Sequence, residues 1–203
     1  MTVDDRRFPR AAQYLATLPQ GLASYPMCEA RGSLVRSLLS DLPLAAAKDG
    51  LPGEILAMVA TPPSNSSWIS EAKLGLLNLA AADFHGLSDA AFLDRKYQQN
   101  RALLGGLVYR ALMSVTSPKM LAEVAAFRFP LVHRGGTAMV VSGHTEGSVE
   151  LRVTYPARLY TRLLAELIGR AFEAALHHSA PKEGRVTLTS FGETEAVFGC
   201  RWT

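Results

Sequence analysis

The spacing of apolar residues changes character along the chain. From residue 26 to 132, apolar side chains recur every three or four positions, which predicts helices. From residue 135 to 203 they mostly alternate with polar side chains, which is typical of half-buried strands around one helix. The pattern therefore predicts an α+β protein, with a helical half (26–132) followed by a strand-strand-helix-strand-strand half (135–203).

In the helical half, start signals and apolar periodicity agree on five segments. The expected helices are 27–39, 53–60, 68–84, 89–115 and 118–127. Ser117-Pro118 is the clearest start, because it places a capping hydroxyl before a proline in the first turn. Ser66 or Ser67 is expected to cap the third helix, and Ser88 the fourth. Gly105-Gly106 predicts a bend or a close helix crossing.

In the second half, two pairs of alternating segments flank a long amphipathic helix. The expected strands are 137–144, 147–155, 185–191 and 194–202, and the helix is 158–178. In the second strand, Val149, Leu151, Val153 and Tyr155 share one face, which is typical of an antiparallel strand with one wet face. The chain contains no repeat and no flexible linker. We therefore predict a single compact domain, 1–203, whose helical N-terminal layer packs on a four-stranded antiparallel sheet.

Composition and charge exclude several classes of protein. Of the 203 residues, 48% are hydrophobic and 19% charged, which is ordinary for a globular protein. The net charge of +3 comes from scattered side chains without a basic block, so no nucleic-acid partner is expected. No apolar run reaches about 20 residues, so no membrane span is expected. Cys28 and Cys200 are read as reduced thiols, and the acidic N-terminus lacks a signal-peptide pattern, which predicts a cytoplasmic location.

The order of these elements resembles a known family. Helices, a strand pair, a Tyr…Arg corner, a long helix and a second strand pair are similar to the heme nitric-oxide/oxygen-binding domain and to four-vinyl-reductase-like domains. The passage "YPARLYTRLLAELIGRAFEAAL" resembles the place where the heme family carries a Tyr-x-Ser-x-Arg motif. The resemblance implies that Tyr155 and Arg158 would hold heme propionates. This chain departs from the motif, since it reads Tyr-x-x-Arg without the serine.

A second departure concerns the heme ligand. The family's proximal histidine lies on a helix before the tyrosine, whereas residues 122–128 here read "AEVAAFR". His133 is the nearest histidine, and it follows the helix-ending Pro130. Heme is therefore not expected, and the cofactor is left unknown. The chain also resembles an uncharacterised myxobacterial paralogous family at "LPQGLASYP", "LMSVTSPKMLAEVAAF", "HRGGT" and "VTYPARLY", which implies a shared fold and no known chemistry.

The strand-to-helix junction is the first candidate ligand site. It gathers Tyr155, Arg158, Tyr160 and Arg162. An arginine at a helix N-terminus opposes the helix dipole, which favours an anionic partner such as a carboxylate or phosphate. The alternative is that the tyrosines are aromatics at the edge of the core and the arginines pair with side chains.

Two further candidates come from loops. His133-Arg134 precede Gly135-Gly136, and a glycine pair permits close approach of a ligand or simply connects a helix to a strand. Trp68 follows a Pro-Pro-Ser-Asn-Ser-Ser loop and either covers a cavity or attaches the loop to the core. No Cys-x-x-Cys, His-Glu-x-x-His or Gly-x-Ser-x-Gly pattern occurs, so we assign no catalytic residue and no metal ligand.

Three functional hypotheses follow. The first is a non-enzymatic cytosolic sensor or signalling module that binds a small apolar or anionic ligand between the helical layer and the sheet. The second is a protein-protein adaptor or homodimer module without a ligand. The third is an enzyme whose site assembles from scattered residues. The missing catalytic motifs and the family resemblance favour the first.

Overall fold

A computed structural model describes residues 3–47, 49–104, 117–179 and 184–203. The chain divides into two compact units. The first comprises residues 1–89 and 131–136, and the second 90–130 and 137–203. Helices and antiparallel sheets occur together, which confirms the α+β class. The boundaries differ from the two predicted halves, because residues 90–130 group with the large sheet. The single compact domain stays a prediction.

The first unit is a helical cluster with a small antiparallel sheet. Its helices are α1 (Pro9–Thr17), α2 (Gly32–Asp41), α3 (Gly53–Ala60) and α4 (Glu71–Phe84), with a short 3₁₀ turn at Gly21–Ala23. Its strands are β1 (Glu29–Arg31), β2 (Trp68–Ser70) and β3 (His133–Arg134), in the order β2-β1-β3. Ten of the fourteen residues of α4 are buried, so this helix forms the centre of the unit's core.

Two predicted helices begin as strands instead. The segment predicted as helix 27–39 opens with β1, and the segment predicted as 68–84 opens with β2. These three-residue strands are too short to show alternation. They form by pairing with each other, and β1 pairs with β3 as well. The predicted cap at Ser66 or Ser67 is wrong, since α4 begins after Ser70. The chain also forms α1, which the periodicity did not predict.

The second unit is a four-stranded antiparallel sheet with helices. Its helices are α5 (Asp89–Leu104), α7 (Pro118–Arg128) and α8 (Arg162–Ser179), with a 3₁₀ turn at Phe129–Leu131. Its strands are β4 (Ala138–Thr145), β5 (Ser148–Thr154), β6 (Gly184–Phe191) and β7 (Glu195–Trp202), in the order β4-β5-β7-β6. Both predicted strand pairs are confirmed. The predicted helix 89–115 is described only as far as Leu104, so Gly105-Gly106 lie outside the described residues.

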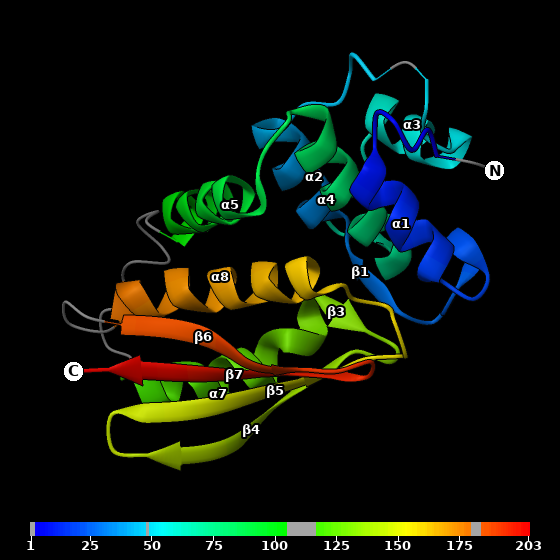
Figure 1. Cartoon of the computed structure of the whole chain (residues 1–203). Coiled ribbons are helices and arrows are strands. Elements are labelled where there is room, and N and C mark those ends of the chain that lie inside the picture. Colours follow the sequence, from blue (N-terminus) through cyan, green and yellow to red (C-terminus); the bar gives the residue numbers. More distant parts are fainter. Residues whose placement is uncertain (1–2, 48, 105–116, 180–183) are drawn as a thin grey trace. The chain divides into compact units, whose positions relative to one another are not determined.

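One face of this sheet carries its core. Val149, Leu151 and Val153 of β5 pair in register with Cys200, Phe198 and Ala196 of β7, and all six are buried. Within this unit, α8 lies along β6 and β7, while α7 lies along β4 and β5 (Figure 1). The period-two pattern therefore predicted the buried face of β5 as well as the strands.

The predicted cap at Ser117 is also confirmed, since its hydroxyl accepts from the backbone N–H of Met120 at 3.2 Å.

The long helix begins later than its pattern indicated. Helix α8 starts at Arg162, and the residues from Pro156 to Thr161 form a turn. Arg158 has a φ of 65°, in the left-handed region that L-residues rarely adopt. The N–H of Arg158 donates to the carbonyl of Glu193 at 2.9 Å. This contact with the β6–β7 turn holds the chain out of the helix.

Across the described residues, no helix combines the length and apolarity needed to cross a membrane.

Candidate functional site

The Tyr155 corner is joined to the β6–β7 turn by hydrogen bonds. The Tyr155 hydroxyl donates to the carbonyl of Gly192 at 3.0 Å, and the Tyr155 N–H donates to Thr194 O at 2.9 Å. The rings of Tyr155 and Tyr160 meet edge to face, with centroids 4.8 Å apart, and both residues are buried. Burial, with a smaller contribution from Glu195, raises the pKa of Tyr155. The corner therefore combines packed aromatics with a satisfied phenol.

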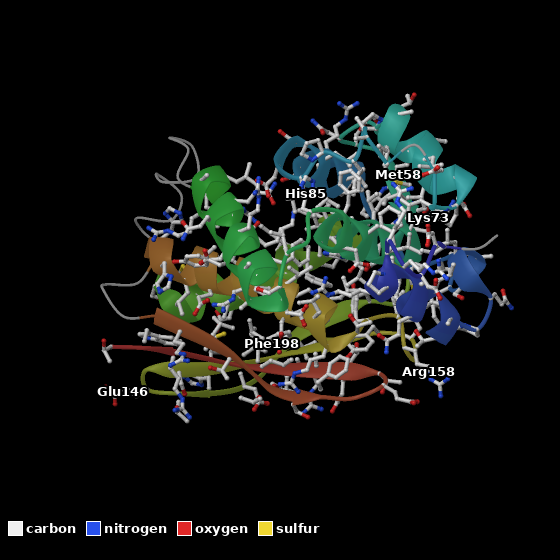
Figure 2. All side chains as sticks on the ribbon, turned by 45° about the horizontal axis from the view of Figure 1, so that its top comes forward. Met58, Lys73, His85, Glu146, Arg158 and Phe198 are labelled. Atoms are coloured by element: carbon white, nitrogen blue, oxygen red, sulfur yellow. The ribbon has the colours of Figure 1, made fainter. Side chains whose placement is uncertain are left out.

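The two predicted arginines of this corner point to different partners. Arg158 is exposed and lies 3.4 Å from the Glu193 carboxylate, and Figure 2 shows it at the end of the sheet opposite Glu146. Arg162 pairs with Glu166 one turn along α8, at 3.0 Å. Both pairs are open to solvent, where ion pairs contribute little to stability. Their ligand role stays a prediction, and Arg162 borders a groove of the second unit.

Trp68 lies between two arginines in the first unit. The guanidinium carbons of Arg31 and Arg134 stand 3.9 Å and 4.0 Å from the centroid of the Trp68 ring. Arg134 pairs with Glu29 at 2.6 Å, while Arg31 donates to the carbonyls of Ser66 and Leu131. The stack thus attaches the proline-rich loop to the small sheet. No local pattern indicates Arg31, because its place opposite Trp68 depends on the pairing of β1 with β2.

His133 joins a buried polar group instead of this stack. Its Nδ1 lies 2.8 Å from Oε1 of Glu71, whose side chain is only 1% exposed. Burial first, and Glu71 second, raise the pKa of Tyr14 and of the Cys28 thiol. Gly135 has a φ of 77°, and a Cβ there would stand 1.6 Å from the Met27 carbonyl oxygen. Protein backbone therefore makes the close approach that the glycine pair permits.

A groove of about 290 Å³ lies between α5, α8 and β6 in the second unit. Its apolar lining comprises Leu93, Gly169, Val186, Leu188 and Phe198. Figure 2 marks Phe198 on β7, and its ring meets that of Phe172 edge to face at 5.6 Å. The charged lining comprises Arg162, Glu166, Arg170, Glu173 and Arg185. Its volume is at the lower end of the range found for small-molecule sites.

The charges of this groove are unevenly satisfied. Arg162 pairs with Glu166, and Arg170 pairs with Glu173. The side chain of Arg185 makes no ion pair or hydrogen bond with any residue that the structure describes. The groove therefore carries one positive charge without a partner from the described chain.

Arg185 also stands opposite a second arginine. It pairs in register with Arg201 across β6 and β7, and both are exposed. The Arg201 side chain likewise has no ion pair or hydrogen bond within the described ranges. Like charges directly opposite on neighbouring strands destabilise a sheet. Both arginines line a wider hollow of about 820 Å³, which shares Glu173 and Arg185 with the groove. The pair is thus placed to bind an anion, and local sequence pattern could not show it.

The described residues do not fit a heme. Helix α7 is the helix on which the family resemblance places the proximal histidine, and it carries no histidine. His85, His133, His177 and His178 each have a ring nitrogen hydrogen-bonded to protein. Tyr155 and Arg158, which the resemblance assigns to the propionates, contact Gly192 and Glu193 of the β6–β7 turn instead. Among the described residues, no group of three His, Cys, Asp or Glu side chains could hold a metal ion.

Known proteins resemble this chain in fold. The sequence matches no protein-family model and no curated protein. Solved structures of H-NOX domains do match. A point mutant of an Fe(II) unliganded H-NOX protein from K. algicida is 16% identical, with 85% of this chain and 96% of that chain covered and a TM-score of 0.56. An oxygen-binding H-NOX domain related to soluble guanylate cyclases is 10% identical, with 85% and 95% covered and a TM-score of 0.57.

A third match is an H-NOX protein from S. oneidensis in the Fe(II)NO state. It is 14% identical, with 85% of this chain and 99% of that chain covered and a TM-score of 0.54. At such low identity the likeness concerns the fold alone. The matches confirm, at the level of the fold, the resemblance to the heme nitric-oxide/oxygen-binding domain, and they cover 85% of this chain. This chain therefore has an H-NOX-like fold whose described residues lack the ligand set for heme.

Proposed function

We propose that this chain is a non-enzymatic sensor or signalling module of the cytoplasm. Its ligand is a small molecule with an anionic head and an apolar body. The head binds Arg185, which borders the groove, and the body lies against Leu93, Leu188 and Phe198. Arg201 stands opposite Arg185 on the solvent face of the sheet and adds positive charge beside the head. The similarity to H-NOX domains, one in an oxygen complex and one in the Fe(II)NO state, supports a ligand-binding role.

The observation that carries this proposal is the opposed arginine pair. Two guanidinium groups on adjacent strands repel each other, and neither has an acidic partner among the described residues. A carboxylate or phosphate between them would replace the repulsion with charge-assisted hydrogen bonds. The neighbouring apolar lining then selects anions that carry a hydrocarbon part.

Octanoate is a suitable probe, with octanol as its uncharged counterpart. We expect octanoate to bind in isothermal titration calorimetry, and octanol to bind at least about 10-fold more weakly, because it cannot form the charged hydrogen bonds. Replacing Arg185→Gln or Arg201→Gln should weaken octanoate binding by about 10- to 100-fold. Arg162→Gln should have a smaller effect, since Arg162 is already paired with Glu166.

Arg128→Gln is the matched control. Arg128 is an exposed arginine at the end of α7 and lies outside the groove lining. It should leave octanoate binding unchanged. Equal affinities for octanoate and octanol, or equal losses in the Arg128 and Arg185 variants, would contradict an anion site at the arginine pair. Native mass spectrometry of the purified chain would show any ligand retained from the cell.

The adaptor or homodimer remains a second candidate function. It is favoured by a separate surface of the second unit, where an exposed strand edge adjoins exposed apolar side chains. That surface does not depend on the groove, so the two roles can be tested independently.

A further inference from the structure

The two edges of the large sheet are protected to different degrees. At one edge, β6 carries Arg185, and the Glu173 carboxylate of α8 accepts from the Val186 N–H at 3.4 Å. A charged side chain and a covering helix are both devices that prevent unwanted strand pairing. At the other edge, the backbone bonds recorded for β4 among the described residues all go to β5.

The sequence of β4 contains few of these protective devices. Its eight residues, "AMVVSGHT", include no Lys, Arg, Asp, Glu or Pro. Only Met139 is buried, and Val140 is 51% exposed. A register shift between Val141 and Gly143 is the one irregularity, and it leaves Ala138–Val141 regularly paired with β5. This stretch is therefore an open template for another strand.

Helix α7 places exposed apolar side chains beside this edge. It packs against β4 and β5 on the core face of the sheet. Its outward positions include Met120, 52% exposed, and Phe127, 84% exposed, with half-buried Val124 between them at helical spacing. An exposed phenylalanine next to an open strand edge forms one continuous surface suited to association.

We propose that the β4 edge and the exposed face of α7 bind a second copy of this chain through a two-fold axis. Residues on the same face must pair in a sheet, so the axis passes through one residue of the strand. We place it at Val140, whose side chain is 51% exposed. Val140 then lies opposite Val140 of the partner subunit, and Met139 lies opposite the partner's Val141. The two sheets join into one of eight strands, which is within the usual range.

A second copy fits this surface better than an unrelated partner because β4 carries no charged side chain near the proposed axis. A two-fold axis places a strand against itself, so any charged residue near the axis would meet its own like charge. The β4 strand carries none within Ala138–Val141. The same axis places both α7 helices on one side of the joined sheet. Met120 and Phe127 are then covered by the same side chains of the copy.

The first measurement is sedimentation velocity of the full chain over a range of concentrations. We expect a dimer at the higher concentrations, and a monomer for Val140→Lys and for Phe127→Asp, with melting temperatures close to wild type. Met27→Lys is the control, because Met27 is 72% exposed but lies in the first unit. A wild-type chain that is monomeric throughout, or a dimer that persists in both variants, would overturn the proposal.

A cysteine cross-link tests the register directly. Only a residue on the two-fold axis faces its own counterpart within disulfide reach. Val140→Cys should therefore yield a disulfide-linked dimer under mild oxidation, while Thr187→Cys on the exposed part of β6 should not. The native Cys28 and Cys200 are buried and should not interfere. Cross-linking through Thr187→Cys but not through Val140→Cys would exclude the β4 edge. Octanoate binding plays no part in either readout.

Discussion

At the scale of single residues, backbone geometry decides several features of this chain. Gly135 and Arg158 both have positive φ, but they reach it for different reasons. Gly135 adopts it without strain because it has no Cβ, and the Met27 carbonyl occupies the space where a Cβ would be. Arg158 adopts it because its N–H bonds to Glu193 in the β6–β7 turn. Such strain at a non-glycine residue costs on the order of 1–3 kcal/mol, so the surrounding contacts must hold it.

Gly135→Ala should destabilise the protein by about 2–4 kcal/mol, because it adds a clash to an unfavourable φ. The measurement is the free energy of unfolding from urea denaturation. Gly53→Ala is the control, since no atom lies within 4 Å of a Cβ at Gly53. It should be neutral or stabilise by up to about 1 kcal/mol. Equal stability of the two variants would show that the backbone at Gly135 relaxes freely.

At the scale of elements, one buried carboxylate fixes the position of α1. The α1 helix has no side-chain cap from its own sequence. Oδ2 of Asp83, at the end of α4, accepts from the backbone N–H groups of Arg10 and Ala11 at 2.9 Å and 3.1 Å. Oδ1 of Asp83 also pairs with the Arg10 guanidinium at 2.9 Å, and the Asp83 side chain is 1% exposed. A distant residue thus supplies the cap that the local sequence lacks.

Asp83→Ala should therefore lower the free energy of unfolding by about 2–4 kcal/mol, since it removes a cap and a buried ion-pair partner together. Thermal and urea unfolding followed by circular dichroism would measure the loss. Asp94→Ala, at an exposed position of α5, should change the stability by less than about 0.5 kcal/mol. A similarly small loss for Asp83→Ala would mean that α1 is held by its apolar contacts alone.

At the scale of the whole molecule, buried acids with raised pKa values couple stability to alkaline pH. Burial, with a smaller contribution from Glu173, raises the pKa of the Cys200 thiol from its ordinary 9.0 to about 12. Burial also raises the pKa of Tyr155 above its ordinary 10.0. The folded state holds these protons more tightly than the unfolded state does. The stability they contribute is complete below pH 9 and is lost as the pH rises toward the folded-state values.

We expect the free energy of unfolding to fall above pH 9, by at most about 1.4 kcal/mol per pH unit for each group. Urea denaturation at closely spaced pH values would measure this fall. Cys200→Ala removes the thiol contribution, so its stability should decline less steeply than wild type between pH 9 and 10. Identical slopes for the two proteins in this interval would contradict the raised pKa of Cys200.

The sequence by itself determined the α+β class, the two strand pairs, the buried face of β5 and the start of α7. These features rest on local signals, because strand alternation, helical spacing and a Ser-Pro cap act between residues a few positions apart. It also determined that the helix after β4 and β5 would lie near two tyrosines and two arginines, although it placed the helix start four residues too early.

Only the tertiary structure decided the small sheet, the stack of Arg31 on Trp68, the Asp83 cap and the pairing of Arg185 with Arg201. Each of these joins residues that are far apart along the chain, and no local period encodes which distant partner a side chain meets. The candidate site shows this most clearly. Arg162 could be predicted from its helix, whereas Arg185 and Arg201 become a pair only through the register of β6 and β7.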